Sequence, residues 1–209
     1  DADTVAGIYG LEIPPVIKFR NGYEQGALYI NPDINVLGAY HNSFNDAAAG
    51  ASAAQQFIGE SAVVIFGSGG QTGSGGILAA AQEGVFVIGV DQDEYYTTFG
   101  GGETPGAEYL ISSAVKRVDL AVYQMVEILA LGELESFPGG TTFVFDAAID
   151  GIGLAERHDA DISDELFEQM EVIFDLLAAG ELATGVNPFT GALIVDGEMS
   201  PEATAEADE

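Results

Sequence analysis

Short apolar runs alternate with amphipathic stretches along the first two thirds of the chain. Five runs predict strands, because turn-forming or polar residues bound them and β-branched residues are frequent in them. They cover residues 4–9, 35–40, 61–66, 85–90 and 109–112. The runs at 61–66 and 85–90 are almost continuously apolar, which is typical of parallel strands buried on both faces.

The segments between these runs carry apolar residues at helical spacing. They predict helices over residues 13–30, 46–58, 76–83 and 114–131. Pro14 and Pro15 suit a helix start, where a missing N–H costs nothing, and Asn45 or Asp46 should cap the second helix. The alternation predicts an α/β fold in which residues 4–131 form a doubly wound parallel sheet with right-handed crossovers.

The last third of the chain has a different pattern. Residues 141–145 predict a strand, and residues 151–155 a short strand or turn. Ser163 is a good N-cap for an amphipathic helix that Gly180 ends. A strand and one helix cannot bury themselves, so we expect this part to pack on another body.

These patterns divide the chain into three regions. We predict an α/β lobe over 4–135, a segment over 136–195 that packs on another lobe or a partner chain, and an acidic disordered tail over 196–209. The unmatched apolar surface of residues 141–180 could also support self-association.

Charge and composition exclude several classes of function. The chain has 34 acidic against 5 basic residues, for a net charge of −29, which repels nucleic acid and anionic membrane surfaces. A solvated acidic surface that keeps the protein soluble explains this charge most simply, and a salt-rich setting would fit because salt screens the repulsion. A specific cation-binding role is the alternative. No apolar run reaches the roughly 18 residues of a membrane span, and the absence of cysteine excludes disulfides.

Motifs for catalysis and metal binding are missing from the sequence. There is no Gly-x-Ser-x-Gly, no His-Glu-x-x-His and no calcium-binding loop. His41 and His158 are far apart and lack partners at metal-ligand spacing, so we interpret both as incidental. We therefore expect a protein that is not an enzyme and that has no metal or cofactor.

A glycine-rich stretch at 67–76 lies between a predicted strand and a predicted helix, where backbone N–H groups can bind anions. Thr72 stands where the dinucleotide fingerprint needs glycine, and no Gly-Lys-Ser/Thr ends the stretch. Without a nearby basic residue a phosphate cradle is disfavoured. The stretch predicts a loop approached by a neutral polar ligand or a tight turn without ligand contact. Phe66 ends the strand before it, and its ring could stack on a base or belong to the core.

Charged residues mark the ends of the next two predicted strands. Asp91 follows the strand 85–90, at the carboxyl edge where open α/β sheets bind ligands. Its carboxylate could accept hydrogen bonds from a ribose, or it could cap a helix. Asp93 and Glu94 are interpreted as solvated neighbours.

The paired cations Lys116 and Arg117 begin the predicted helix 114–131. They cannot face the same way on a helix. One could point into a ligand cleft while the other pairs with an acid such as Asp119 or Glu108, or both could form ordinary surface ion pairs.

Several motifs together resemble the BMP/PnrA-like lipoproteins. They are Gly10-Leu-Glu-Ile-Pro-Pro-Val-Ile-Lys-Phe19, Gly22-Tyr-Glu-Gln-Gly26, Asn42-Ser-Phe-Asn-Asp46, Val85-Phe-Val-Ile-Gly-Val-Asp-Gln-Asp93 and Asp150-Gly-Ile-Gly-Leu-Ala155. Their order and spacing make the chain similar to the C-terminal part of the family sequence. The resemblance implies a type I periplasmic-binding-protein fold, in which this chain supplies the second lobe and a return segment to a first lobe missing from it.

The resemblance also implies a function. Proteins of this family are substrate-binding components of ABC importers and usually hold a purine nucleoside between aromatic rings, with an acid and a lysine on the ribose. These roles fall on Phe66, Asp91 and Lys116, with Gly67 and Gly70 lining the loop. The implied partner is the transporter permease. A lipid anchor outside this chain would hold the protein at the extracellular or periplasmic side of the membrane.

Two alternatives stay open at this point. The protein could be a sugar-binding relative of the same fold. It could also be a structural or assembly subunit derived from a binding protein, with a vestigial ligand site.

We expect the melting temperature to rise with sodium chloride, because the Debye length falls from about 30 Å at 0.01 M to about 3 Å at 1 M and so screens the acidic surface. Calorimetric melting across that range is the measurement. A flat or falling melting temperature would mean that charge repulsion is not a major term in the stability.

Overall fold

The computed structural model describes residues 4–194, so the tail predicted over 196–209 lies outside the described residues. A six-stranded sheet with the order β2-β1-β3-β4-β5-β6 forms its centre. The strands are β1 Thr4–Tyr9, β2 Asn35–Tyr40, β3 Val64–Ser68, β4 Phe86–Asp91, β5 Leu110–Lys116 and β6 Ile152–Leu154. The first five are parallel and β6 is antiparallel to β5, which confirms the predicted α/β class and adds one antiparallel strand.

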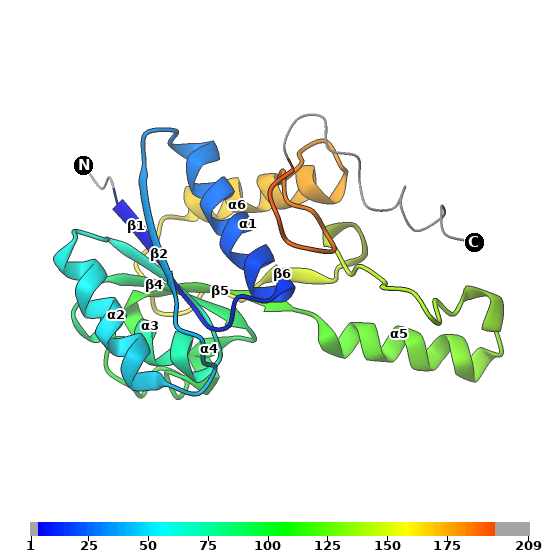
Figure 1. Cartoon of the computed structure of the whole chain (residues 1–209), viewed down its shortest axis with the longest axis horizontal. Helices are drawn as coiled ribbons and strands as arrows, with labels where there is room; N and C mark the ends of the chain where they lie inside the picture. The colour runs from blue at the N-terminus through cyan, green and yellow to red at the C-terminus, as the bar shows by residue number, and fades with distance from the viewer. Residues whose placement is uncertain (1–3, 195–209) are drawn as a thin grey trace.

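Helices cover both faces of the sheet (Figure 1). Helix α1 (Pro14–Ile30) lies on one face, and α2 (Ala47–Gly59) and α3 (Gln71–Gln82) lie on the other. The shorter and later helical elements are α4 Glu94–Thr97, η1 Ala107–Tyr109, α5 Val118–Leu131, η2 Leu134–Ser136, η3 Ala147–Ile149 and α6 Asp164–Ala178. Two predictions about helix starts are confirmed. Pro14 and Pro15 open α1, and Asp46 caps α2 by accepting a hydrogen bond from the Ala49 amide at 2.9 Å.

The glycine-rich stretch at 67–76 is mostly helix, so the prediction of a loop there is wrong. Its glycines allow close packing of α3. A Cβ atom at Gly73 would lie 2.9 Å from the Gly67 carbonyl carbon, and one at Gly75 would lie 2.5 Å from the Ala47 carbonyl oxygen. Glycine disfavours helix by propensity alone, and here tertiary packing overrides that propensity.

Strand β5 is longer than the sequence predicts. Ala114 and Val115, assigned to a helix by their spacing, pair instead with Val90 and Asp91 of β4. Helix α5 therefore begins at Val118. As a result Lys116 ends a strand and does not begin a helix.

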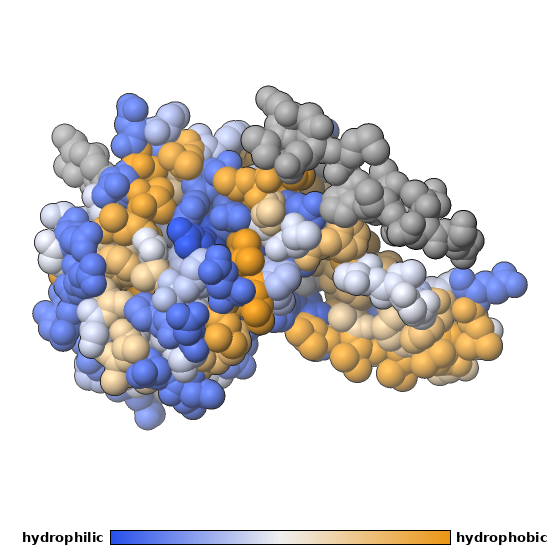
Figure 2. All heavy atoms as spheres, in the orientation of Figure 1, coloured by the Kyte–Doolittle hydropathy of each residue, from blue (hydrophilic) through white to orange (hydrophobic). Residues whose placement is uncertain are grey.

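Helix α5 extends away from the sheet and has no buried residue (Figure 1). Apolar side chains dominate its surface (Figure 2). Those exposed by about half or more are Val118, Val122, Tyr123, Val126, Leu129 and Leu131. Residues 141–145 follow without strand pairing, so the strand predicted there is wrong for this structure. Phe143 and Phe145 contact each other with ring centroids 5.0 Å apart.

The chain then returns to the lobe. Strand β6 joins the lobe's own sheet, and α6, capped by Ser163 as predicted, faces α1 across an apolar groove of about 380 Å³. Ile173 and Leu177 of α6 line this groove together with Leu28 and Tyr29 of α1. The segment that leads away from the sheet therefore comprises α5 and the residues up to β6. The sequence pattern predicts instead that the strand at 141–145 and the helix after Ser163 leave the sheet together.

We expect Gly50→Ala to destabilise the protein, because the new Cβ would overlap the Thr72 carbonyl oxygen at the contact between α2 and α3. Overpacking of this kind typically costs about 1–3 kcal/mol. Gly59→Ala in the same helix is the matched control, since nothing lies within 4 Å of a Cβ there. Urea unfolding measures both free energies, and equal stabilities of the two variants would contradict the packing argument.

Candidate functional site

The candidate site lies where β4 and β5 end at the carboxyl edge of the sheet. Asp91 is the last residue of β4 and Lys116 the last residue of β5. The Lys116 Nζ atom is 2.8 Å from Asp91 Oδ1, and the two side chains are 44% and 50% exposed. Both line an open depression of about 560 Å³. The structure thus presents a carboxylate and an ammonium group together to solvent.

Asp91 has an uncommon backbone conformation for a residue with a side chain. Its φ is +66°, in the left-handed region that few residues other than glycine adopt. The Gln92 amide donates to the Val90 carbonyl at 2.8 Å, which closes a tight turn at the strand end. Such conformations cluster at functional sites, where the surrounding structure holds them.

The second cation of the pair, Arg117, lines the same depression but pairs with a different acid. Arg117 donates to both carboxylate oxygens of Asp119, with its closest contacts at 3.0 Å. This hydrogen bond holds the pKa of the Asp119 carboxyl below its usual range. Each cation therefore forms a surface ion pair, Lys116 with Asp91 and Arg117 with Asp119, which is the second of the two sequence-based alternatives.

The other three predicted site residues lie apart from this pair. Phe66 does not end its strand, because β3 continues to Ser68. Its side chain is 3% exposed and packs under α1, with ring centroids 5.1 Å from Tyr23 and 6.2 Å from Phe19. The edge position predicted for Phe66 is thus wrong, and its ring is covered by core aromatic residues.

The two glycines occupy structural positions. Gly67 lies within β3 against α3, where a Cβ would be 2.7 Å from the Gly73 carbonyl oxygen. Gly70 caps the N-terminus of α3 with φ +56°. Of the two, only Gly70 lies at the carboxyl edge of the sheet.

Phe44 is an edge aromatic residue that the sequence-based assignment missed. It follows β2 and is partly buried. A Cβ at Gly10 would lie 2.5 Å from its ring, and one at Gly70 would lie 2.9 Å from its carbonyl oxygen. The Asn42-Ser-Phe-Asn-Asp46 motif directly after a strand was the available signal, because residues after parallel strands share one edge.

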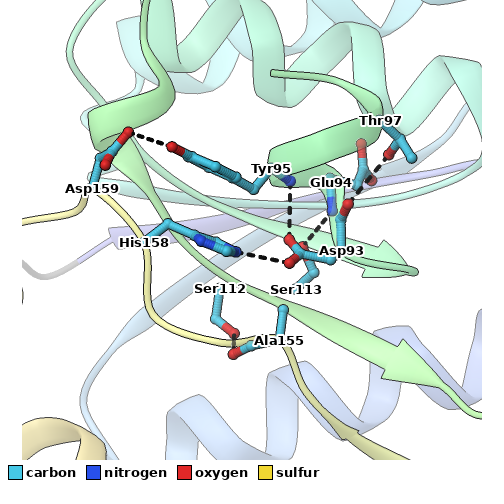
Figure 3. A network of polar contacts seen from close by, with 9 residues as sticks. All are labelled: Asp93, Glu94, Tyr95, Thr97, Ser112, Ser113, Ala155, His158 and Asp159. Carbon is cyan, nitrogen blue, oxygen red and sulfur yellow. Dashed lines mark hydrogen bonds and ion pairs between the residues drawn. The ribbon is translucent and has the colours of Figure 1, made fainter. Parts of the chain in front are cut away.

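Two residues near Asp91 are not the solvated neighbours that the sequence suggests. Glu94 is only 3% exposed and accepts hydrogen bonds from the Val90 amide at 3.2 Å and from the Thr98 hydroxyl. Burial raises the pKa of its carboxyl group, and these hydrogen bonds oppose the increase. Asp93 lies 2.7 Å from the Nε2 atom of His158 (Figure 3), so His158 is not incidental either.

Two features are absent from residues 4–194, a metal-binding cluster of side chains and a membrane-spanning helix. In this range no group of three or more His, Asp and Glu side chains is arranged to hold a metal ion. No helix in the same range combines the length and the apolar character needed to cross a bilayer.

The mostly parallel sheet and its charged carboxyl edge are those of an α/β fold with a candidate ligand site at the strand ends. The family model described as "ABC transporter substrate-binding protein PnrA-like" matches residues 2–174. The chain therefore belongs to this family, as its motifs predicted. The family consists of binding proteins, which agrees with the prediction that the chain is not an enzyme.

Individual relatives agree with the family match. The chain is 36% identical over 140 residues to "Basic membrane protein D" of Borreliella burgdorferi, covering 66% of this chain and 38% of that protein. It is 28% identical over 178 residues to "ABC transporter nucleoside-binding protein BmpA" of Lactococcus lactis, covering 80% of this chain and 50% of that protein.

A solved solute-binding protein of an ABC transporter system, from Aeropyrum pernix, shows the same fold. It superimposes with a TM-score of 0.68 at 23% identity, covering 86% of this chain and 57% of that chain. Two curated relatives match this chain over most of its length, and the chain spans about half the length of each of them.

We expect Glu94→Gln to stabilise the protein at neutral pH and to lose this advantage in acid. The raised folded-state pKa means that the wild-type carboxyl contributes stability while protonated, and that this contribution is lost as pH rises from the unfolded-state pKa through the folded-state pKa. Urea unfolding between pH 4 and pH 7.5 measures the difference.

Glu83→Gln is the control for that experiment, because it removes one charge from the acidic protein at an exposed position. A similar gain for both variants at every pH would show that net charge, and not the burial of Glu94, sets the effect.

Proposed function

We propose that this chain is the second lobe of a substrate-binding protein that captures a neutral nucleoside for an ABC importer. The pairing of Asp91 with Lys116 at the carboxyl edge carries the proposal. A half-exposed carboxylate accepts hydrogen bonds from two adjacent hydroxyls, while a neighbouring ammonium donates to their oxygens. A ribose offers such a pair of hydroxyls.

The charge of the protein favours an uncharged ligand. A phosphate group would approach a chain of net charge −29, and Lys116 is already neutralised by Asp91 at 2.8 Å. The name of the Lactococcus lactis relative, a nucleoside-binding protein, supports the same ligand class. Phe44, on the same edge, is our candidate for an aromatic contact with the base, in place of Phe66.

We further propose that a first lobe of the longer protein covers α5 and residues 141–145. An isolated helix with an exposed apolar surface leaves a large area in contact with water, which costs free energy roughly in proportion to that area. Relatives about twice as long as this chain contain sequence that could supply the covering lobe. A ligand enclosed between two lobes would lose more of its surface to the protein than one on an open edge.

The proposed partners and location follow from the same assignment. The closed, loaded protein would deliver its ligand to the permease of the transporter. It would act outside the cytoplasmic membrane, held there by a lipid anchor outside this chain.

A second candidate function is an assembly subunit with a vestigial site. The exposed apolar surface of α5 favours it, because another protein chain could cover the same surface. Intact mass and sedimentation of the native protein separate the two: a longer monomer supports the two-lobed receptor, and a stable oligomer of short chains supports assembly.

We expect Asp91→Ala to weaken nucleoside binding by the full-length protein. The loss would leave ribose hydroxyls unpaired, at a cost of about 1–3 kcal/mol, or roughly tenfold to a hundredfold in affinity. Titration calorimetry with inosine, guanosine, ribose and the matching nucleotides measures it. Asp33→Ala is the matched control, because it removes an exposed carboxylate before β2, at the opposite edge of the sheet.

The outcomes of this titration discriminate among the ligand classes. Nucleosides should bind more tightly than nucleotides, and ribose alone should bind weakly. Tight binding of ribose with no gain from the base would support a sugar-binding relative. Equal affinities for wild type and Asp91→Ala, or a preference for nucleotides, would overturn the proposed site.

A further inference from the structure

We propose that Asp93 and His158 are positioning residues that hold the turn carrying Asp91 in its ligand-binding geometry. This inference rests on the proposed function, since it concerns the same carboxylate. The two residues are far apart in the sequence yet meet at 2.7 Å. They join the end of β4 to residues 151–159, the segment that contains β6 and its continuation.

Asp93 uses its two carboxylate oxygens for different contacts (Figure 3). Its Oδ1 atom accepts a hydrogen bond from the Tyr95 amide at 3.0 Å and so caps α4. Its Oδ2 atom contacts His158 Nε2. Asp93 lies two residues after Asp91, whose φ of +66° must be held by its surroundings. A fixed Asp93 therefore limits the conformations open to the turn.

The imidazole of His158 is itself held on several sides. Its ring stacks on Tyr95, with centroids 3.9 Å apart and planes 10° apart, and meets the edge of Tyr96 at 5.4 Å. The side chain is 11% exposed. The neighbouring Asp159 accepts a hydrogen bond from the Tyr95 hydroxyl at 2.8 Å. A ring held this firmly loses little further freedom when it contacts Asp93.

Backbone contacts fix the same segment to β5. The Ala155 amide donates to the Ser113 carbonyl at 2.9 Å, and the Ser112 hydroxyl donates to the Ala155 carbonyl at 3.0 Å. Ile152 pairs with Lys116 in the antiparallel register of β5 and β6. Residues 151–159 therefore brace both members of the Asp91–Lys116 pair, one through Asp93 and the other through strand pairing.

This arrangement predicts that His158 contributes to ligand affinity without touching the ligand. With the contact intact, the turn is ordered before the ligand arrives, so binding does not have to order it. Without the contact, Asp91 would sample other orientations and the competent one would be only partly populated. The apparent affinity would then fall in proportion to the population of the competent orientation.

The test compares three variants of the full-length protein by titration calorimetry with inosine. His158→Ala should weaken binding about tenfold, the size of one lost hydrogen bond to a charged group. His158→Gln should recover most of the affinity, because its side-chain amide can donate to Asp93 from a similar reach. Tyr95→Phe is the matched control: it removes the hydroxyl bond to Asp159 and keeps the ring under His158.

A second readout does not depend on the ligand. Amide hydrogen exchange at residues 92–96 should be faster in His158→Ala than in wild type and unchanged in Tyr95→Phe. If wild type fails to bind inosine, the proposed function fails while this exchange pattern still supports the positioning role. The inference is overturned by wild-type affinity in His158→Ala, by equal weakening in Tyr95→Phe, by failure of His158→Gln to recover, or by unchanged exchange in His158→Ala.

Discussion

The parallel pairing of β4 with β5 is the constraint on which the candidate site depends. Val87 pairs with Leu110 but Ile88 pairs with Ser112, so one residue of β5 is passed over and the register shifts. From there the strands run together until Asp91 pairs with Val115, which brings the next residue, Lys116, to the Asp91 carboxylate. Without that shift a different residue of β5 would end beside Asp91. Irregularities of this kind often re-aim side chains next to functional sites.

Close helix packing and the returning chain hold this edge in place from two directions. On one face, glycines let α3 lie directly against β3 and α2, which fixes the short connection that ends at Gly70. On the open side, β6 closes the edge of β5, and the contact between Asp93 and His158 links it to the turn after β4. Helix α5 lacks comparable support within residues 4–194, and its exposed apolar surface is the part of the lobe that most needs a covering partner.

Much of the fold was predictable from alternation and capping alone. The bounds of β1 and β2 and the caps of α2 and α6 agree with the sequence pattern because local propensity and tertiary structure favour the same outcome there. The start of α3 and the end of β5 were mispredicted. At the start of α3, close packing of the glycines outweighs their low helix propensity. At the end of β5, strand pairing of Ala114 and Val115 with β4 outweighs their helical spacing. The predicted strand at 141–145 lacks a neighbouring strand, and pattern alone cannot supply one.

The site was predicted less completely than the fold, because tertiary contacts that no local pattern reveals decide where several of its residues lie. Asp91 and its neighbour Lys116 follow from the rule that ligands bind at strand carboxyl ends. Phe66 was misplaced because its strand runs two residues further than its apolar run indicates. The contact of Asp93 with His158 joins residues 65 positions apart, and no local pattern in either segment indicates it.

The most direct test of the proposed site is a crystal structure of the full-length protein with inosine bound. We expect the ribose hydroxyls to lie within hydrogen-bond distance of Asp91 and Lys116, at the carboxyl edge, with a first lobe covering α5. A nucleoside bound elsewhere, with the Asp91–Lys116 pair left facing solvent, would contradict it.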